Sequence, residues 1–397
     1  MLDVSYRKIY LGDLFNIFTG KKNVNETDPN GKYTFFSCSP ESFHSNEYIY
    51  NGEAIIIAGN GSYTGTVRFF NGAFDLYQRT YALTPKDEMV DTKYVYYLLK
   101  MKFEAIYMGG SRGSSIPYIV MGDIADFEIS LPPLPEQKRI SSILSSFDNK
   151  IEQLKKQNNI LEDIAQSIFK EWFVKYNFPN KEGKPYKNNN GKMIDSELGL
   201  IPEGWRVGKL GEICELKSGF AFKGEDFVEK SNTKVIKIKN LQGKGNIDTS
   251  NLSHIKEDVV KVERIKDFIL SEGDILIAMS GNTTGKIGTM PYTDSPVYLN
   301  QRVGKLFFKN KDYHNYIYNF LMINNYEEKI LNMGYGSAQP NINPSQIENI
   351  KILKPSTFLL DLYNQKTNII YQKKRENIKN IIKLTKSKNI LLNKLFQ

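Results

Sequence analysis

Residues 140–172 read ISSILSSFDNKIEQLKKQNNILEDIAQSIFKEW and predict one long helix. Its apolar residues recur at alternating steps of four and three, which is the heptad pattern of a coiled coil. With Leu144 at heptad position a, Asn158 also falls at a, where a buried Asn fixes register at a cost in stability. At about 1.5 Å per residue the helix spans about 48 Å. The seam is Ile140, Leu144, Phe147, Ile151, Leu154, Asn158, Leu161, Ala165, Ile168 and Trp172.

A second, weaker seam occupies the C-terminal residues. Thr367, Lys374, Asn377 and Lys388 interrupt it, so we expect it to pair with the first seam, as an antiparallel coiled coil. The alternatives are two separate bundles, or helices that belong to the cores of their own domains. The apolar positions of this seam are Tyr363, Ile370, Ile381, Leu384, Leu391 and Leu395.

The chain outside the two seams is also duplicated. Leu11-Gly12-Asp13-Leu14 returns 199 residues later as Leu210-Gly211-Glu212-Ile213. From Gln78-Arg79, which returns as Gln301-Arg302, the offset is 223 and holds to Phe173 and Phe396. The second copy therefore carries 24 extra residues between Gly219 and Gln301. A period near 200 is too long for a solenoid, so one domain plus one helix is used twice.

Each globular half is predicted to be α+β. Ala54–Ile57 and Thr66–Phe70 are predicted strands, Tyr94–Tyr107 is a predicted helix, and a strand ends at Leu131. We also expect a short helix at Leu11–Phe18 and a helix at Tyr316–Leu331. The dipeptides Asn30-Gly31, Asn51-Gly52 and Asn71-Gly72 are typical of hairpin turns.

The predicted fold class is therefore α+β, with two similar β-rich domains joined by two long helices and related by a pseudo-twofold axis. The Asn-, Lys-, Gly- and Pro-rich stretch after residue 176 is predicted to be a linker. The predicted parts are a first domain at 1–132, a helix at 133–176, the linker at 177–204, a second domain at 205–355 and a helix at 356–397.

Composition limits the possible environment and partners. The formal net charge is +9, which weakly favours a polyanionic partner. Residues 361–397 hold nine basic and two acidic side chains, either as a solvated helix face or as a face toward DNA phosphate or an acidic partner. Two Cys residues make no disulfide framework, and Cys214 aligns with Phe15 as a core residue. Without a signal peptide or membrane span, we expect a cytoplasmic protein.

The sequence contains few candidates for catalytic chemistry. His44, His254 and His314 are isolated, so a zinc site is not expected. The stretch Gly281–Lys286 resembles a phosphate-binding loop, but it has three residues between its glycines, and Ile287 stands where Ser or Thr would bind magnesium. Nucleophile-elbow and amino-methyltransferase motifs are also missing. We expect a non-catalytic chain with no metal or cofactor of its own.

Two motifs around the linker carry a family resemblance. Gln166–Val174 (QSIFKEWFV) is followed by Asp195–Trp205 (DSELGLIPEGW) and by Lys209–Ile213 (KLGEI). Together they resemble the central conserved region of type I restriction–modification specificity subunits, the HsdS family. Pro132–Gln137 is similar to that family's exit from a target recognition domain, and Ser218–Lys223 to the opening of one domain class. The N-terminus lacks the Pro-Glu-Gly-Trp lead-in that precedes the second domain.

The resemblance implies a non-catalytic scaffold that binds double-stranded DNA. Each recognition domain would read one half of a split, asymmetric site, and the helices would set the gap. Two modification (M) subunits would dock on the helices and methylate adenine with S-adenosylmethionine. Up to two restriction (R) subunits would add ATP-driven translocation and cleavage, so S-adenosylmethionine, ATP and Mg²⁺ would belong to the partners.

Other functions compete with this one. A specificity subunit could serve a methylation-only or type II-like bipartite system. A fused methyltransferase–nuclease would need catalytic motifs that the sequence lacks, and a coiled-coil adaptor would bind only protein. Salt-dependent binding to DNA distinguishes the first class from the adaptor.

The duplication separates the candidate DNA contacts into two kinds. Side chains that both copies share should hold the fold or phosphate, and unshared loop residues should read bases. The shared Arg79 and Arg302 are either buried arginines that tie strands together or phosphate contacts. Arg112 and Gln339 are the preferred base readers, because Arg binds guanine and Gln binds adenine; solvated loop residues are the alternative. The full candidate set is Asn60, Ser62, Tyr63, Arg68, Gln78, Arg79, Ser111, Arg112, Ser114, Lys223, Thr283, Lys286, Gln301, Arg302, Tyr335, Ser337, Gln339 and Asn341.

Overall fold

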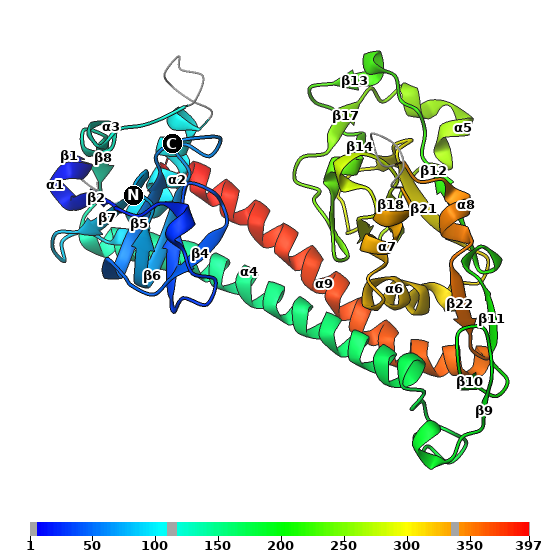
Figure 1. The fold of residues 1–397 in the computed structure, drawn as a ribbon. Coiled ribbons are helices and arrows are strands. Elements are labelled where there is room, and N and C mark those ends of the chain that lie inside the picture. The colour runs from blue at the N-terminus through cyan, green and yellow to red at the C-terminus, as the bar shows by residue number, and fades with distance from the viewer. Residues whose placement is uncertain (1–5, 109–116, 335–340, 397) are drawn as a thin grey trace. The chain divides into compact units, whose positions relative to one another are not determined.

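The structure, a computed structural model, describes residues 6–108, 117–334 and 341–396. The chain divides into two compact units (Figure 1). The first contains the chain up to Gln153 together with the residues from Ile382 onward, and the second is Leu154–Ile381. Each unit therefore contains an α+β domain and part of each long helix.

The first unit is built on a six-stranded sheet with the order β2-β7-β5-β6-β3-β4. Neighbouring strands are antiparallel except β3 and β6, which are parallel. Val95, Leu98 and Leu99 of helix α2 pack against Ile55 and Ile57 of the sheet. The strands are β2 (Phe15–Thr19), β3 (Tyr33–Phe36), β4 (Ser42–Ser45), β5 (Tyr50–Ala58), β6 (Val67–Leu76) and β7 (Thr80–Pro85), and α2 is Thr92–Tyr107.

One end of the antiparallel helix pair, where α4 begins and α9 ends, contributes to this core. Ile140 and Leu144 of α4 and Leu392 and Phe396 of α9 are buried in the same cluster as α2. The ring of Phe396 lies 5.4 Å from that of Tyr94, measured between centroids. The remaining elements here are β1 (Arg7–Tyr10), which pairs with β8 (Glu128–Leu131), and the short helices α1 (Leu11–Leu14) and α3 (Met121–Ala125); α4 is Leu134–Phe169 and α9 is Thr357–Phe396.

The second unit repeats four of the six strands of the first unit's sheet in the same order. Its sheet order β12-β21-β18-β19 matches β2-β7-β5-β6, and β11 pairs with β22 as β1 pairs with β8. The offset is 199 for β1 and β2, 220 for the ends of β5 and the start of β6, and 223 from β7 onward. The predicted duplication is confirmed, and 21 of the 24 extra residues precede β18. The matching elements are β11 (Arg206–Lys209), β12 (Cys214–Ser218), β18 (Ile275–Ala278), β19 (Ile287–Thr289), β21 (Val303–Phe308), β22 (Lys351–Lys354) and α8 (Pro344–Glu348).

The segment between β12 and β21 also builds a separate sheet with the order β13-β17-β14-β20. Its small core joins Phe222, Val235 and Ile255 to Ile265 and Tyr298. The strands of this sheet are β13 (Phe227–Val228), β14 (Lys234–Ile236), β17 (Ser253–Ile255) and β20 (Val297–Leu299); the other short elements are β9 (Met193–Ile194), β10 (Ile201–Pro202), β15 (Leu241–Gly243), β16 (Asn246–Ile247) and α5 (Glu263–Lys266).

The two long helices pair antiparallel within each unit. In the first unit Lys388 donates to Asp148 at 2.6 Å. In the second unit Asn377 donates to Asn158 at 3.0 Å, and the seam continues to the Trp172 ring, 5.9 Å from that of Tyr363. All the predicted seam residues are buried or partly buried. The predicted fold class, two α+β domains joined by two long helices, is confirmed.

The polar interruptions of the second seam do not weaken it in the way its sequence suggests. Lys374 forms an ion pair with Glu162 at 2.6 Å, and Asn377 is buried against Asn158. Thr367 is buried and accepts a hydrogen bond from Asn315 of α6 at 3.1 Å. Each inward polar group therefore has a partner on a facing element, which removes the cost of burying it unpaired.

Several local predictions are wrong. The predicted helix at Leu11–Phe18 ends at Leu14, and the chain continues as β2. The predicted helix at Tyr316–Leu331 is two helices, α6 (His314–Ile323) and α7 (Tyr326–Met333), because Asn325 adopts a left-handed conformation with φ of +52°. The apolar residues keep a helical period across this break, so the sequence pattern does not reveal it.

Two of the three predicted hairpin dipeptides lie inside strands. Gly52 of β5 pairs directly with Gly72 of β6, with φ of +148° and +145°. Only Asn30-Gly31 forms a turn, in which Gly31 N–H donates to the Asp28 carbonyl at 2.9 Å. The register of β5 and β6 runs without a break through both glycines, so these two dipeptides do not reverse the chain.

The stretch 177–204 is more ordered than the word linker suggests. Phe178 is buried, and its ring stacks on Trp205 at 5.3 Å and on Tyr186 at 4.6 Å. It follows a π-helical turn, η2 (Lys170–Val174), in which Lys175 N–H donates to the Lys170 carbonyl at 2.8 Å. Aromatic packing thus fixes a segment whose composition is polar.

Candidate nucleic-acid interface

Each unit carries the same loop at the end of the sheet strand β5 or β18. In the first unit the loop is Asn60–Gly65, with φ of +82° at Gly61 and +85° at Gly65. In the second it is Ser280–Gly285, with φ of +75° at Gly281 and +83° at Gly285. The buried Thr64 and Thr284 hydroxyls donate to the Gly61 and Gly281 carbonyls at 2.7 and 2.6 Å. The two loops therefore have one backbone conformation.

A helix closes over the last glycine of each loop. A Cβ on Gly65 would lie 2.8 Å from the Tyr107 carbonyl carbon, and one on Gly285 would lie 2.3 Å from the Glu327 carbonyl oxygen. Glu104 and Glu327 secure the strand that follows, since their carboxylates accept the N–H groups of Val67 and Ile287 at 2.7 and 3.0 Å. The sequence analysis missed this glutamate pair, although its 223-residue offset marks it.

The shared Gln-Arg dipeptide lies beside this loop. Gly59 N–H donates to the Arg79 carbonyl at 2.9 Å, and Met279 N–H donates to the Arg302 carbonyl at 3.0 Å. The interpretation of a buried arginine that ties strands together is wrong, because the backbone carbonyl makes the tie and both arginine side chains are exposed. Within the described residues neither guanidinium has an ion pair or a hydrogen bond. Gln78 and Gln301 are exposed as well.

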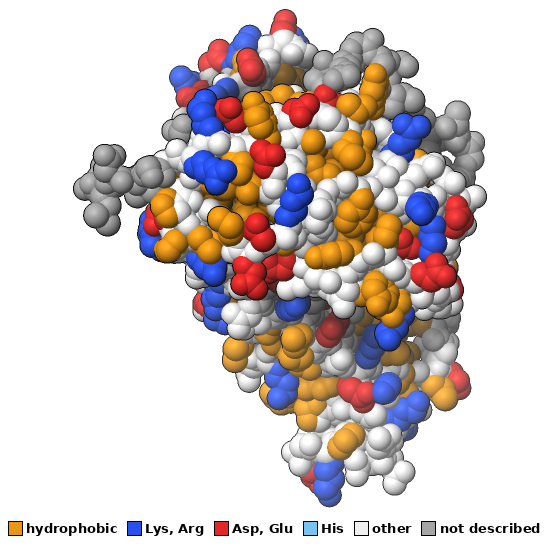
Figure 2. Space-filling view, turned by 90° about the vertical axis from the view of Figure 1, so that its left-hand side faces the viewer, with side chains coloured by type: hydrophobic (Ala, Val, Ile, Leu, Met, Phe, Trp, Pro, Cys, Tyr) orange, Lys and Arg blue, Asp and Glu red, His pale blue; other side chains and the backbone are white. Residues whose placement is uncertain are grey.

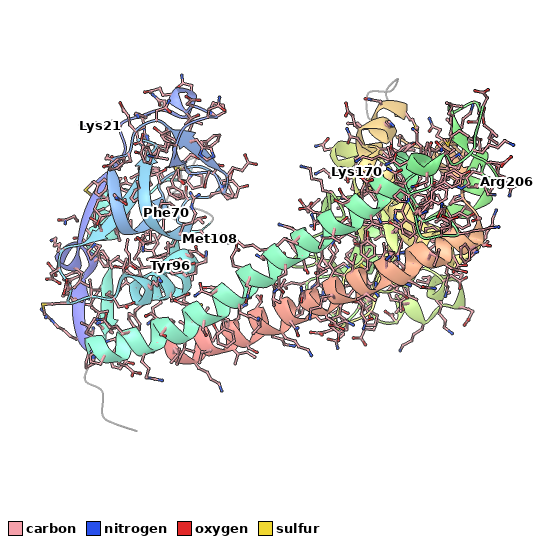
Figure 3. All side chains as sticks on the ribbon, turned by 90° about the horizontal axis from the view of Figure 1, so that it is seen from below. Lys21, Phe70, Tyr96, Met108, Lys170 and Arg206 are labelled. Atoms are coloured by element: carbon pink, nitrogen blue, oxygen red, sulfur yellow. The ribbon has the colours of Figure 1, made fainter. Side chains whose placement is uncertain are left out.

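In the first unit the structure brings most of the described candidates together. Asn60, Ser62 and Tyr63 are on the loop, and Tyr63 is 47% exposed. The strand after the Gly/Ser segment joins them, because Gly61 N–H donates to the Pro117 carbonyl at 3.0 Å. Met108, at the end of α2, is the last described residue before that segment (Figure 3). Ser111, Arg112 and Ser114 lie outside the described residues.

In the second unit the corresponding edge is hollow. Gln301, Arg302 and Asn341 line a depression of about 340 Å³ together with Ser218, which the sequence analysis did not select. Thr283 and Lys286 lie on the adjoining loop, and the Thr283 hydroxyl donates to the Ile238 carbonyl at 2.9 Å. Tyr335, Ser337 and Gln339 lie outside the described residues. A polar, open edge of this kind suits a base edge or a phosphate better than an apolar ligand.

Two of the predicted DNA contacts, Arg68 and Lys223, interact with protein groups away from this site. Arg68 donates to the Ser37 carbonyl at 2.6 Å and lies over the Phe36 ring at 5.4 Å. Burial lowers the pKa of its guanidinium, and its Nε and Nη1 atoms are buried without a partner. Lys223 pairs with Glu225 at 3.6 Å, next to the short helix η5 (Gly224–Asp226). Neither lies on the duplicated loop or the Gln-Arg turn.

Basic and acidic side chains are mixed on one face of the molecule and are partly paired along α9. On the face drawn in Figure 2, basic, acidic and hydrophobic side chains are interspersed, and no single sign dominates. Of the basic residues in α9, Lys374, Lys379 and Lys388 pair with Glu162, Glu272 and Asp148. The basic C-terminal stretch is thus partly a source of internal ion pairs.

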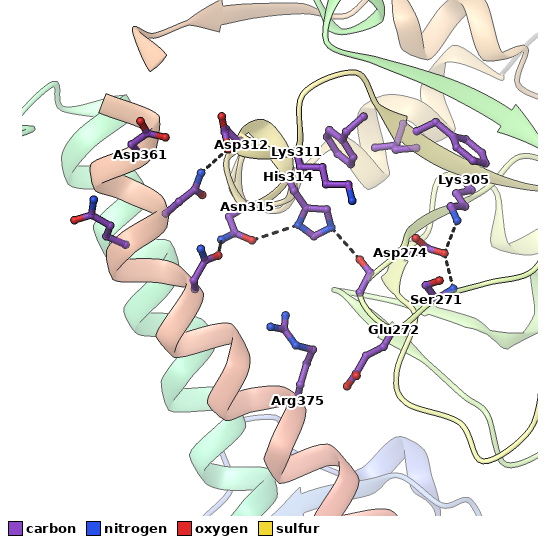
Figure 4. A pocket seen from close by; sticks show the side chains of 17 residues that line it. Ser271, Glu272, Asp274, Lys305, Lys311, Asp312, His314, Asn315, Asp361 and Arg375 are labelled. Carbon is purple, nitrogen blue, oxygen red and sulfur yellow. Dashed lines mark hydrogen bonds and ion pairs between the residues drawn. The ribbon is translucent and has the colours of Figure 1, made fainter. Parts of the chain in front are cut away.

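A larger hollow, of about 1030 Å³, lies between α9 and the second domain (Figure 4). Its polar groups largely bind one another: Asp274 pairs with Lys305 at 2.6 Å, His314 Nε2 bonds the Gly273 carbonyl at 3.0 Å, and Asn315 donates to Asn368 at 2.8 Å. It contains none of the predicted DNA contacts. The bond from Asn315 to Asn368 attaches the domain to α9, and the other two lie within the domain.

The fold and the paired loops define a class of protein with two recognition modules on a helical scaffold. The family described as type I restriction modification DNA specificity domain matches residues 4–163 and 202–392, and the chain belongs to this family. This confirms the resemblance found in the sequence and the prediction of a non-catalytic specificity subunit. Membership of the family implies DNA binding and assembly with other restriction–modification subunits.

Individual relatives agree with this assignment. The type I restriction enzyme MjaVIII specificity subunit of Methanocaldococcus jannaschii is 31% identical over 363 residues, which cover 87% of this chain and 81% of that protein. The EcoDI specificity subunit of Escherichia coli is 30% identical over 231 residues, which cover 55% of this chain and 50% of that protein. The crystal structure of a type I system S subunit from M. genitalium has the same fold, with a TM-score of 0.60 and 20% identity over 100% of this chain and 97% of that one. No helix among the described residues has the length and hydrophobicity needed to cross a membrane.

Proposed function

We propose that this chain reads a split, asymmetric DNA site, with one half-site for each recognition domain. The observation that carries the proposal is the loop that follows β5 and the loop that follows β18, each beside its Gln-Arg dipeptide. The two loops have the same backbone conformation but differ in their other side chains. Phosphate contacts position a protein on DNA whatever the sequence, whereas base contacts specify the sequence. Two edges with one scaffold and two sets of side chains suit two different half-sites.

In this proposal two M subunits dock on the helices, and up to two R subunits join the assembly. S-adenosylmethionine, ATP and Mg²⁺ are then bound by those partners. This chain selects the DNA sequence and sets the length of the gap between the two half-sites. Exposed apolar side chains on the long helices support a docking role: Phe358 and Ile369 of α9 are each 71% exposed, and Ile160 of α4 is 58% exposed. A subunit docked on the helices would remove these side chains from water.

A domain exchange tests independent reading. Residues 1–131 are replaced by the matching domain of a relative, and the motif methylated by the assembly with M subunits is read by methylation sequencing. We expect one half-site to change and the other to remain. The matched control exchanges the second domain, which must change the opposite half. If both half-sites changed in either chimaera, independent reading would be excluded.

A protein-only adaptor is the competing function. The side chains of Arg79 and Arg302 are exposed and form no ion pair or hydrogen bond among the described residues, which favours DNA. When arginines contact phosphate, the logarithm of the DNA affinity falls linearly with the logarithm of the salt concentration. Binding of the assembly to duplex DNA is therefore measured at several salt concentrations; absence of a salt dependence would favour the adaptor. Adding the R subunit and ATP separates a restricting system from a methylation-only one, because only the former cleaves DNA.

A further inference from the structure

The two copies place different residues at one equivalent position of the sheet edge. Ile119 N–H donates to the Gly59 carbonyl at 2.9 Å, and Ile342 N–H donates to the Met279 carbonyl at 2.8 Å. The residue before each isoleucine bridges to the loop, Tyr118 to Asn60 and Asn341 to Ser280. Positions 118 and 341 are thus structurally equivalent, and each adjoins the shared arginine turn.

The polar residues that line the hollow in the second unit are not equally available. Asn343 caps α8, its side-chain oxygen accepting the Ser345 N–H at 3.3 Å, and the side-chain Oε1 of Gln346 accepts the Asn343 N–H at 2.9 Å. The corresponding residue in the first unit, Asp123, accepts the Val120 N–H in the same way at 2.8 Å. These groups serve the fold in both copies.

Gln301, Asn341 and Arg302 remain uncommitted, and the two that differ in chemical kind from each other and in their sharing between the copies are Asn341 and Arg302. Both are exposed, and within the described residues neither side chain has a hydrogen bond or an ion pair. One of them is shared between the copies and the other is not. A shared, permanently charged group and an unshared amide, side by side at an open edge, match the two kinds of contact that DNA recognition needs.

We infer that Asn341 reads a base in the second half-site and that Arg302 contacts the adjoining phosphate, with Tyr118 and Arg79 as the corresponding pair in the first half-site. This rests on the proposed function. An asparagine amide donates and accepts at once, so it matches the N7 and N6 groups of adenine in the major groove. Tyrosine offers a single hydroxyl and cannot form that pair of bonds. The two domains therefore differ in the base that this position selects.

The test uses the complete assembly with M subunits and a library of DNA sites, with methylation read by sequencing. Asn341→Asp keeps the size of the side chain but removes its donor, and Asn341→Tyr installs the residue of the first copy. Each should reduce the preference for adenine at one position of the second half-site by about tenfold or more. The first half-site should not change.

Arg302→Ala tests the other half of the inference. It should weaken binding by a similar factor at every site and lower the slope of log affinity against log salt by about one, without changing the motif. Arg206→Ala is the matched control, since it removes the same exposed charge from β11 in the same unit (Figure 3). It should leave affinity and slope at the wild-type values.

The outcomes separate this inference from the proposed function. If the wild-type assembly methylated no split motif, the proposed function itself would fail. If it did, and both Asn341 variants kept the wild-type preference, the base-reading role would be refuted. A changed motif in Arg302→Ala, or an equal loss of binding in Arg206→Ala, would refute the phosphate role.

Discussion

At the scale of single residues, the two glycines of each recognition loop serve different purposes. Gly61 and Gly65 have almost the same positive φ, near +82° and +85°. A Cβ on Gly61 would meet nothing within 4 Å, whereas one on Gly65 would lie 2.8 Å from the Tyr107 backbone. Gly61 is needed only for its dihedral angles, and Gly65 also for the close approach of the helix α2.

This difference predicts unequal effects of alanine. Gly61→Ala should cost about 1–2 kcal/mol from the left-handed conformation alone. Gly65→Ala should cost about 1–3 kcal/mol more, because the helix must move as well. Urea unfolding followed by circular dichroism measures both variants, and Gly61→Ala serves as the control. Equal destabilisation would show that the helix does not press on the loop.

The two cysteines should differ in reactivity. Burial raises the pKa of the Cys214 thiol to about 12, whereas Cys38 is partly exposed beside the Arg79 carbonyl. Only Cys38 should therefore react with a thiol reagent in the native protein at pH 8. Titration of one thiol before unfolding and two after it checks this; two reactive thiols in the native state would contradict it.

The raised pKa of Cys214 also predicts how stability varies with pH. The unfolded thiol ionises at a pH where the folded one is still protonated, so the stabilisation is complete below about pH 8.5. It is lost as pH rises from there toward 12. The melting temperature should fall between pH 7 and pH 10, and less so in Cys214→Ala. An equal fall in that variant would assign the effect to buried tyrosines such as Tyr96, whose pKa burial raises to about 12.

At the scale of elements, the helix pair breaks the symmetry of the repeat. Applying the 223-residue offset to Asn158 and Asn377 gives Ile381 and Leu154. The layer of the helix pair formed by Asn158 and Asn377 is therefore an amide pair, and the layer related to it by the repeat, Leu154 and Ile381, is apolar. Such a polar layer costs stability relative to an apolar one but penalises wrong registers, in which an amide would be buried unpaired.

A double-variant cycle tests the amide layer. Asn158→Leu should destabilise the chain by about 1–3 kcal/mol, because the buried Asn377 amide loses its acceptor at 3.0 Å and keeps only the long bond to Gln157 at 3.5 Å. The variant with both residues changed to Leu should recover most of this loss. Thermal unfolding of the three variants and the wild type gives the coupling energy. Additive effects would mean that the two amides do not depend on each other.

At the scale of the whole molecule, the helices are expected to act as a ruler. One heptad adds about 10.5 Å of helix, or about three base pairs. The antiparallel register places Leu154 opposite Ile381 and Lys155 opposite Asn380, so matched heptads belong after Leu154 and after Asn380. The assembly should then methylate the same half-sites with a gap longer by about three base pairs. An unchanged gap would show that another element sets the spacing.

The asymmetry of the helix pair also predicts the behaviour of separated halves. A fragment of residues 1–176 that pairs with itself in the register of the intact chain places Asn158 against Leu154 of its twin. Its pairing with residues 177–397 restores the Asn158–Asn377 and Glu162–Lys374 contacts. Sedimentation of the mixed fragments should therefore show the heterodimer in preference to the homodimer. Equal amounts of both would mean that the polar layers do not select the partner.

The sequence by itself determined the repeat, the long helices, the α+β class and the family. These rest on local periodicity and on identity between the copies, which need no knowledge of contacts. The shared Gln-Arg turn and the loop candidates Asn60, Ser62 and Tyr63 were also found in this way. The hairpins at Asn51-Gly52 and Asn71-Gly72 and the helix at Tyr316–Leu331 were wrong because turn chemistry and helical period are local signals that neighbouring strands and one left-handed residue overrode.

Only the tertiary structure decided which polar groups are committed. Lys374, Asn377 and Lys388 disrupt a seam in the sequence, yet they face Glu162, Asn158 and Asp148 across the helix pair. The sequence alone does not distinguish Arg68 from Arg79. In the structure Arg68 donates to the Ser37 carbonyl, whereas the Arg79 side chain is exposed. The physical reason is that the availability of a polar group depends on partners more than 30 residues away, and folding alone brings those partners together.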